Sequence, residues 1–192
     1  MVEVANEWRK QFPGEFFFSH GSNHSCGVAI LVYKSLDFKL ISLHIDNEGR
    51  YLILEAIIQD MRFVLINIYE PNKTSNQSSY FLALSELIPV EHLRESNYKF
   101  LIGGDFNVAL QPSLDCSGGN TTLKESIKFL EDLLTHYDLV DIWRVCDPKS
   151  KKFTWHQRRL DYWFISNLLQ DMSPKLILLL ASKQITLLSF LK

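Results

Sequence analysis

The sequence has few cysteines, and their spacing excludes the usual structural uses of this residue. Cys26, Cys116 and Cys146 are odd in number, widely separated and without a Cys-x-x-Cys pair. This pattern argues against a disulfide framework and against a zinc site. We therefore expect buried free thiols, a reducing compartment and no disulfide-linked partner.

Long apolar runs are also lacking. The longest tract, Leu176 to Ala181, is far shorter than the roughly 18 to 20 residues that a membrane span requires. The N-terminus has no basic region followed by an apolar run, so it does not resemble a secretion signal. These absences predict a soluble intracellular protein, nuclear or cytoplasmic, with no membrane partner.

Positive charge is not in excess either, because 20 Lys and Arg against 22 Asp and Glu give a net charge of -2. A nucleic-acid partner would have to be met by a local patch. One segment offers such a patch, with six basic residues and the single acid Asp147, which give +5. The basic residues are Arg144, Lys149, Lys151, Lys152, Arg158 and Arg159. Interleaved aromatic residues suit a phosphate backbone, although exposed charge runs are usually only solvated faces.

What is present favours one globular domain of mixed strands and helices. The 192 residues are 46% hydrophobic, enough for a sizeable core. Helical spacing predicts helices over 4–12, 80–88 and 122–137, the last opened by a Thr-x-x-Glu capping box. Apolar runs predict strands over 15–19, 27–33, 39–46, 51–59, 63–69, 100–102, 152–155 and 160–166. Short polar links at 46–49 and 59–61 predict hairpins, so we expect an α/β sandwich with an antiparallel or mixed sheet.

The predicted central strand ends in a chemically distinctive sequence. Its apolar run is closed by Gly103-Gly104, and Asp105 and Asn107 follow directly. A carboxylate beside a carboxamide offers an acceptor for a hard cation together with a hydrogen-bonding group, which suits phosphate chemistry. The same two residues also suit an Asx turn that satisfies only local backbone amides.

Two other polar residues lie in predicted strands. Tyr69 ends an apolar strand, where its phenol could hold a phosphoryl oxygen or simply be half-buried. Asp161 lies in the otherwise apolar sequence Leu160-Asp161-Tyr162-Trp163, where an unpaired charge is costly. A histidine or a metal would serve function there, whereas Arg159 or backbone amides would serve structure.

Five motifs in this order resemble the endonuclease/exonuclease/phosphatase superfamily. They are Tyr69-Glu70-Pro71-Asn72, Gly103-Gly104-Asp105-Phe106-Asn107, Asp141-Ile142-Trp143-Arg144, Phe153-Thr154-Trp155 and Arg159-Leu160-Asp161-Tyr162. Within the superfamily, the chain is most similar to the endonuclease domain of LINE-type non-LTR retrotransposons, relatives of exonuclease III and the apurinic/apyrimidinic endonucleases. The resemblance covers nearly all of residues 1–170, and five ordered motifs are far more specific than one.

The resemblance implies a DNase I-like fold, a four-layered α/β/β/α sandwich with the site at one end of its sheets. It implies that Tyr69 contacts phosphate, that Asp105 activates water or serves a Mg²⁺ site, and that Asn107 orients Asp105. It implies further that Thr154 contacts the scissile-strand phosphate and that Asp161 holds a catalytic histidine. The substrate would be DNA, and the patch residues Arg144, Lys151, Lys152, Arg158 and Arg159 would contact it.

The chain also departs from the family pattern. Family members begin with strands that carry an Asn and a metal-binding Glu, and we find no counterpart before residue 15, so we expect the first strands to be missing. They end with a Ser-Asp-His motif, but residues 173–192 contain no Asp, Glu or His. Another reading frame of codons for Ser182 to Leu188 can spell Gln-Thr-Asp-His-Ser. We therefore expect an incomplete domain over 1–170 and an aberrant, frameshifted tail over 171–192.

These observations predict a Mg²⁺-dependent DNA endonuclease that nicks a target strand, with little or no activity because the metal-binding Glu and the catalytic His are lacking. The first alternative is a non-catalytic pseudoenzyme that binds nucleic acid through the 144–159 segment. A further alternative is a phosphatase of the same superfamily.

Overall fold

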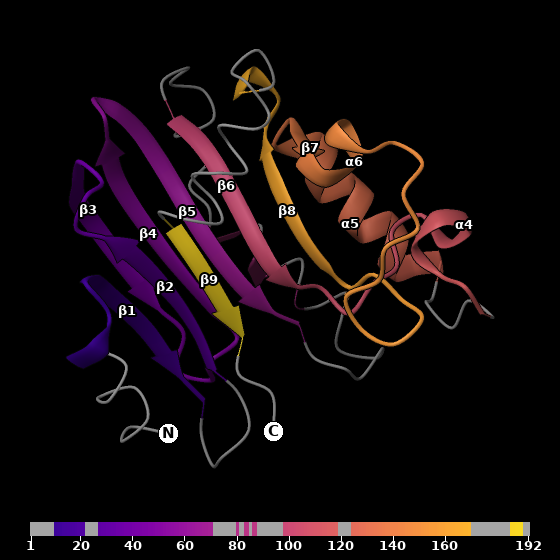
Figure 1. Cartoon of the computed structure of the whole chain (residues 1–192), viewed down its shortest axis with the longest axis horizontal. Helices are drawn as coiled ribbons and strands as arrows, with labels where there is room; N and C mark the ends of the chain where they lie inside the picture. Colours follow the sequence, from indigo (N-terminus) through magenta and orange to yellow (C-terminus); the bar gives the residue numbers. More distant parts are fainter. Residues whose placement is uncertain are drawn as a thin grey trace.

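A computed structural model of the chain describes residues 10–21, 27–70, 80, 83–84, 86–87, 98–118, 124–169 and 185–189. The described strands form two sheets that pack face to face (Figure 1). The larger sheet has six strands in the order β3-β4-β5-β6-β8-β7, and the smaller has three in the order β1-β2-β9. Only β5 and β6 pair in parallel; every other described pair is antiparallel.

The smaller sheet contains β1 (Gly14–His20), β2 (Gly27–Tyr33) and β9 (Ile185–Ser189). The larger contains β3 (Phe38–Ile45), β4 (Tyr51–Ile58), β5 (Met61–Tyr69), β6 (Tyr98–Asp105), β7 (Leu139–Asp141) and β8 (Asp161–Ser166). The helices are α4 (Pro112–Asp115), α5 (Lys124–His136), α6 (Ile142–Cys146) and a 3-10 turn, Asn167–Leu169.

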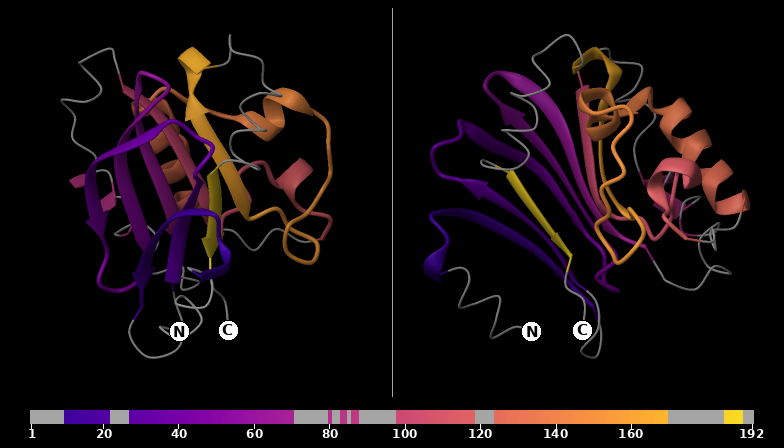
Figure 2. Two further views of the ribbon diagram at one scale, coloured as in Figure 1. Left: turned by 60° about the vertical axis from the view of Figure 1, so that its left-hand side comes forward. Right: turned by 45° about the vertical axis from the view of Figure 1, so that its right-hand side comes forward.

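Apolar side chains explain the layers. Between the two sheets lies one cluster, with Val28 and Ile30 of β2 packed near Leu54 and Leu65 of the larger sheet. A second cluster lies on the opposite face of the larger sheet, where Leu130 of α5 joins the strand residues. Figure 2 shows α5 beside that face. The larger sheet is therefore buried on both sides at its centre, as its nearly continuous apolar strands predict.

Most predicted elements are confirmed. The strands predicted at 15–19, 27–33, 39–46, 51–59, 63–69, 100–102 and 160–166 all form, as does the helix that the apolar stripe of 123–137 predicts. Both predicted hairpins join antiparallel strands. The helix at 80–88 is helical at its described positions. Most of the helix at 4–12, and the capping residue at 122, fall outside the described residues.

The strand predicted at 152–155 is wrong. These residues form a loop that ends in a tight turn, in which the amide of Trp155 donates to the carbonyl of Arg158 at 2.9 Å and the reverse bond measures 2.8 Å. His156 has a φ of +45° within this turn. The aromatic residues Phe153 and Trp155 suggested a strand, but the backbone groups of Trp155 bond to Arg158 within the turn and not to a strand of a sheet.

Cysteine usage agrees in part with the expectation. Cys116 is a buried free thiol, whereas Cys146 is free but exposed. Cys26 lies outside the described residues. Within the described chain, no helix is long and apolar enough to cross a bilayer.

Gly104 of β6 meets a steric limit that only glycine satisfies. Its φ is +129°, and a Cβ at this position would lie 2.0 Å from the carbonyl oxygen of Ile68. We expect Gly104→Ala to lower the free energy of unfolding by about 3 kcal/mol or more, because it combines overlap with backbone strain. Urea denaturation measures this.

Gly118→Ala is the matched control. A Cβ there would meet only the flexible end of Gln157, at 3.0 Å, so we expect a change within about 0.5 kcal/mol. Equal stability of the two variants would contradict the close approach of β5 and β6 at Gly104.

Candidate active site

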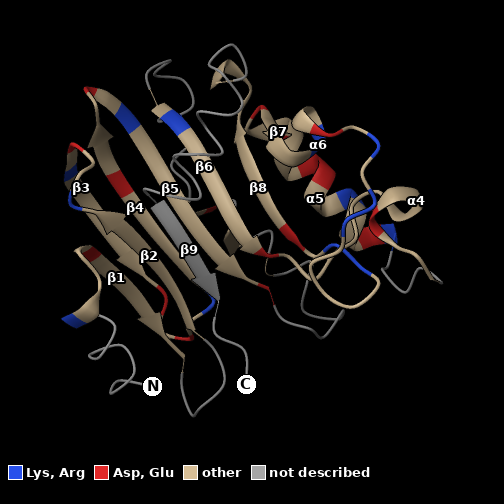
Figure 3. Ribbon diagram, viewed as in Figure 1, with Lys and Arg blue, Asp and Glu red and all other residues tan. Residues whose placement is uncertain are grey.

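The pairing of three strands brings distant motif residues together. In the parallel pair β5 and β6, Tyr69 lies opposite Asp105, and in the antiparallel pair β6 and β8, Asp105 lies opposite Asp161. Residues directly opposite each other point to the same face of a sheet. Tyr69, Asp105 and Asp161 therefore form a row across one end of the larger sheet, on the face toward the smaller sheet. Figure 3 shows acidic positions at the adjoining ends of β6 and β8.

Asp105 is nearly buried and is held by the turn that follows it. It is 8% exposed, and the backbone amide of Asn107 donates to its carboxylate at 3.0 Å. Asn107 has a φ of +49°, and its side-chain amide donates to the backbone carbonyl of Glu70 at 2.8 Å. The Asx turn expected as an alternative is thus present, and it ties the end of β6 to the end of β5.

Glu70 is a site residue to which the sequence pattern assigned no role. It is 0% exposed, and within the described chain neither of its carboxylate oxygens has a hydrogen-bond partner. Burial, with the charge of Asp105 as a smaller cause, raises the pKa of Glu70 to about 9. Burial also raises the pKa of Asp105 to about 6, where the bond from Asn107 opposes the shift and the charge of Asp161 adds to it. The site therefore carries an excess of buried carboxyl groups.

Thr154 connects the loop before β8 to this row. Its hydroxyl oxygen accepts hydrogen bonds from the amides of Leu160 at 3.0 Å and Asp161 at 3.1 Å. Burial raises the pKa of Asp161, and a hydrogen bond with the Thr154 side chain opposes the shift. Arg159, one of the partners expected for the Asp161 carboxylate, pairs with Asp115 and Asp141 instead. The partner that the structure shows is the Thr154 side chain.

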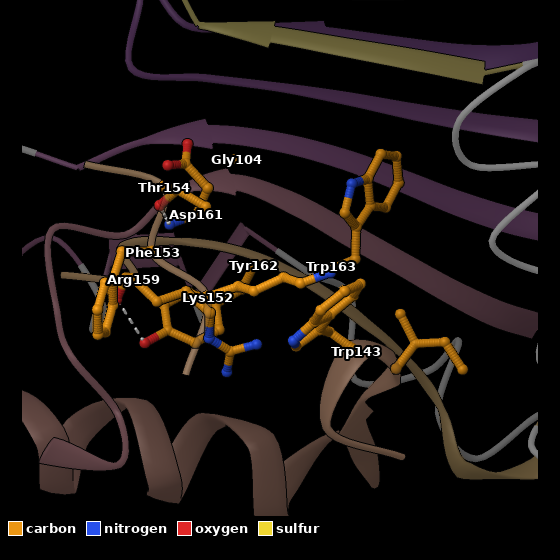
Figure 4. Close-up of a pocket in the computed structure, with 10 residues that line it drawn as sticks. Gly104, Trp143, Lys152, Phe153, Thr154, Arg159, Asp161, Tyr162 and Trp163 are labelled. Atoms are coloured by element: carbon orange, nitrogen blue, oxygen red, sulfur yellow. Dashed lines mark hydrogen bonds between the residues drawn. The ribbon is translucent and has the colours of Figure 1, made fainter. Parts of the chain in front are cut away.

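A pocket of about 360 Å³ opens beside Thr154 and Asp161. Trp143 of α6, Trp163 of β8 and Lys152 contribute to its wall, as Figure 4 shows. The ammonium of Lys152 lies 5.3 Å from the centre of the Trp143 ring. Gly104 also lines the pocket, so the pocket adjoins the strand that carries Asp105. Its lining combines aromatic surface with two cations, Lys152 and Arg159, the hydroxyls of Thr154 and Tyr162, and the Asp161 carboxyl.

Two arginines of the predicted patch are committed to the protein interior. Arg159 is 3% exposed and forms ion pairs with Asp115, at 2.9 Å, and with Asp141. Arg144 pairs with the same carboxylate of Asp115 at 2.6 Å. The guanidinium of Arg159 also lies over the ring of Tyr162, 4.3 Å from its centre. These contacts position the loop before β8, and they differ from the surface location expected for both arginines.

Other members of the patch remain at the surface. Lys149, Lys151 and Lys152 are exposed, and Arg158 is half-buried. Tyr69 is buried, with the guanidinium of Arg50 lying 5.2 Å from its ring centre. The predicted site residues thus divide into a row on three strands, with Tyr69 and Asp105 buried and Asp161 exposed, and a cationic loop next to it.

Comparison with known proteins gives a consistent result. No protein-family model matches the chain. Over 189 residues it is 29% identical to the "Transposon TX1 uncharacterized 149 kDa protein" of Xenopus laevis, a match that covers 93% of this chain and 14% of the relative.

Three solved structures have a similar fold. The AP endonuclease LMAP from Leishmania major is matched over 100% of this chain and 75% of its own, with a TM-score of 0.71 and 15% identity. The 3′ phosphatase NExo from Neisseria, solved with product DNA hairpin, is matched over 87% and 72%, with a TM-score of 0.62 and 19% identity. Truncated TDP2 from Caenorhabditis elegans is matched over 86% and 65%, with a TM-score of 0.55 and 16% identity.

The chain therefore has the same DNase I-like α/β fold as these three structures. Its sequence is similar to a segment of a transposon protein, so the resemblance predicted from the five motifs is confirmed on both counts.

Asp115 should be the residue on which the loop before β8 most depends. Its carboxylate accepts bonds from Arg144, Arg159, the amide of Gln111 and the hydroxyl of Tyr162. Because Asp115→Ala removes the ion-pair partner of Arg144 and leaves the buried Arg159 with Asp141 alone, we expect it to lower the free energy of unfolding by about 3–5 kcal/mol.

Urea denaturation checks this, with Asp132→Ala on the exposed side of α5 as the control, which should change stability by less than about 0.5 kcal/mol. An Asp115→Ala protein as stable as this control would contradict the buried network.

The raised pKa of Glu70 predicts how stability depends on pH. The folded protein holds the Glu70 proton up to a pKa of about 9, whereas the unfolded chain releases it near its ordinary pKa of 4.5. Between these two pKa values the folded state binds more protons than the unfolded chain. The contribution of Glu70 to the free energy of unfolding is therefore fully present below pH 4.5 and is lost as the pH rises toward 9. Glu70→Gln removes this loss.

Chemical denaturation in a chelating buffer should therefore show Glu70→Gln and wild type equally stable near pH 4.5 and the variant increasingly more stable toward pH 9. Glu48→Gln in the exposed β3–β4 turn is the control and should follow wild type. Parallel curves for Glu70→Gln and wild type would rule out a buried, protonated Glu70.

Proposed function

We propose that this chain is the endonuclease domain of a retrotransposon protein and that it nicks DNA, weakly for want of the family's metal-binding Glu and catalytic His, by hydrolysing one phosphodiester bond with the help of Mg²⁺. The observation that carries the proposal is the row of Tyr69, Asp105 and Asp161 across three strands, beside the pocket that contains Thr154. The similarity to a transposon protein supports the DNA substrate.

The two acids of the row suit proton transfer and positioning. A pKa of about 6 keeps Asp105 largely ionised near neutral pH yet basic enough to take a proton from an attacking water. Asn107 fixes the Asp105 carboxylate through its backbone amide. Negative charge develops on the leaving oxygen, and Asp161, whose pKa is raised by burial, would in its protonated form donate a proton to that oxygen.

The phosphate contacts come from the loop before β8 and from β5. The Thr154 oxygen accepts from two amides and its side chain is hydrogen-bonded with the Asp161 carboxyl, so the hydroxyl lies at the pocket, where it would donate to a phosphate oxygen when substrate is bound. Lys152, at the same pocket, supplies positive charge. Lys151 and Arg158 extend this charge along the DNA backbone, while Arg144 and Arg159 act indirectly by holding the loop.

The residues present fit a divalent cation with few protein ligands. Among the described residues, no group of three His, Cys, Asp or Glu side chains could hold a metal ion. Mg²⁺ commonly binds one or two carboxylates and completes its shell with water and substrate phosphate. Asp105, which is largely ionised near neutral pH, would be one such carboxylate. When bound, Mg²⁺ would neutralise charge on the phosphate and its leaving oxygen.

A second candidate function is DNA binding without cleavage. It is favoured by the lining of the pocket, in which the described residues include Asp161 but no histidine. Loss of a general base or metal ligand costs orders of magnitude in rate, so a domain of this kind would retain the cationic loop and lose the chemistry.

Nicking of supercoiled plasmid with Mg²⁺ tests the proposal. We expect wild-type protein to convert supercoiled to open-circular DNA, and we expect Asp105→Asn to reduce the rate by about 100-fold or more. Asp132→Asn, on the exposed side of α5, is the control for the charge change and should nick like wild type. Equal nicking by Asp105→Asn and wild type would exclude Asp105 as the base.

If folded protein does not nick the plasmid but binds DNA with an affinity that falls as the salt concentration rises, the second candidate function is supported. In that case Lys152→Ala should weaken binding and lower the slope of log affinity against log salt by about one. Folded protein that neither nicks nor binds DNA would contradict both functions.

A further inference from the structure

Strand β3 is the most unusual surface of the molecule. It forms one border of the larger sheet (Figure 1) and pairs with β4 alone among the described strands. Every residue from Lys39 to Ile45 is exposed. Four of these residues are large and apolar, with exposed fractions of 36%, 43%, 41% and 46% for Leu40, Ile41, Leu43 and Ile45. The described chain has seven such exposed side chains, so more than half lie on this one strand.

Edge strands of this kind attract partners. Their outer amides and carbonyls are unpaired, and proteins usually protect them with charges, prolines or shortness. β3 is 8 residues long and has Lys39 as its one charged residue and no proline. A register shift between Leu40 and Ser42 places Ile41 in a bulge, which is its only evident protection.

The register with β4 shows which side chains share a face. Leu40, Leu43 and Ile45 lie opposite Ala56, Leu54 and Leu52. These three β4 residues belong to the core between the sheets. The exposed apolar residues of β3 therefore continue the inter-sheet face past the part that the smaller sheet covers. They form an apolar ledge at the open edge.

We propose that β3 pairs antiparallel with β3 of a second copy of the chain, about a two-fold axis at Leu43, so that two larger sheets become one continuous sheet. Such an interface is isologous, with the same patch used on both sides. Strand addition to an open edge satisfies the free backbone groups.

Charge complementarity selects this partner and this register. The bulge means that Ile41 and Ser42 together occupy one position along the strand. An axis at Leu43 then places each Leu43 opposite the Leu43 of the second copy, and each Leu40 opposite its Ile45. Every opposed pair then lies on one face of the sheet. The same register places Lys39 opposite Asp46 of the second copy at both ends, which gives two favourable charge pairs.

Two neighbouring registers also keep the faces matched, and both are worse. One would place Lys39 opposite His44 and Asp37 opposite Asp46, and like charges directly opposite are destabilising. The other would place Leu40 and Lys39 opposite Asn47 and Glu48, which lie in the turn beyond the end of β3. In the favoured arrangement the row of site residues, which begins on β5, stays two strands away from the edge. The dimer would therefore leave both candidate sites open, and the inference does not rest on the proposed function.

Sedimentation velocity without DNA tests the proposal. We expect wild-type protein to form a dimer at tens of micromolar. Leu43→Lys should weaken dimerisation at least tenfold, because it places two ammonium groups at the axis. Leu168→Lys is the matched control, because Leu168 is 65% exposed and lies far along the chain on the turn after β8, and it should dimerise like wild type.

Charge reversal tests the register itself. Lys39→Glu and Asp46→Lys should each weaken the dimer, and the double variant should restore it. Circular dichroism verifies that each variant is folded, which is needed because the Asp46 side chain accepts a bond from the Arg50 amide at 2.7 Å. A second route is Leu43→Cys, which should form an intermolecular disulfide on mild oxidation. A wild-type monomer at 100 micromolar, or a dimer unaffected by Leu43→Lys, would overturn the proposal.

Discussion

The position of β6 between a parallel neighbour and an antiparallel one is the constraint on which the rest of the structure depends. β5 and β6 end together, and β8 begins where they end, so three strands from separate parts of the chain present their termini at one corner. This requires close approach, and Gly104 permits it by leaving the space beside the Ile68 carbonyl empty. A side chain there would separate the strands that align Tyr69, Asp105 and Asp161.

A buried set of ion pairs holds the second half of the site. Asp115 in α4, Asp141 before α6 and Arg159 before β8 are distant in sequence, yet their charges meet inside the protein. Burying charge is costly unless each group is well bonded, and Asp115 meets this condition with four donors. The network fixes the path of the loop that carries Thr154, and the most basic segment of the chain thereby serves the fold as well as the surface.

Much of the fold was predictable because its strands are apolar and its turns polar. The alignment of Tyr69, Asp105 and Asp161 followed from motif order, whereas their distances depend on strand register, which a single sequence does not contain. The strand predicted at 152–155 failed because its aromatic residues mimic a strand pattern, while Thr154 and the Trp155–Arg158 turn bond locally.

Burial explains the remaining differences. Arg159 and Lys152 are both basic residues of one basic segment, and the sequence does not distinguish them. The structure shows that Arg159 is buried between the carboxylates of Asp115 and Asp141, whereas Lys152 is exposed. The sequence pattern assigned no role to Glu70. Only the packing around it shows that its carboxylate oxygens are buried and have no hydrogen-bond partner among the described residues. The apolar pattern of β3 predicted a strand correctly, yet it gave no sign that the strand would lie at an edge.

The register of the three central strands also governs when the site comes into existence. Tyr69, Asp105 and Asp161 lie 36 and 56 residues apart along the chain. Their pairing requires closure of long loops, which is slow relative to the formation of local structure. In a chain still emerging from the ribosome, with β8 not yet synthesised, only β5 and β6 of the three strands that carry the row are present. Such a chain lacks Asp161. The domain therefore assembles this row only once its tertiary structure is complete, so translation products that end before β8 lack it.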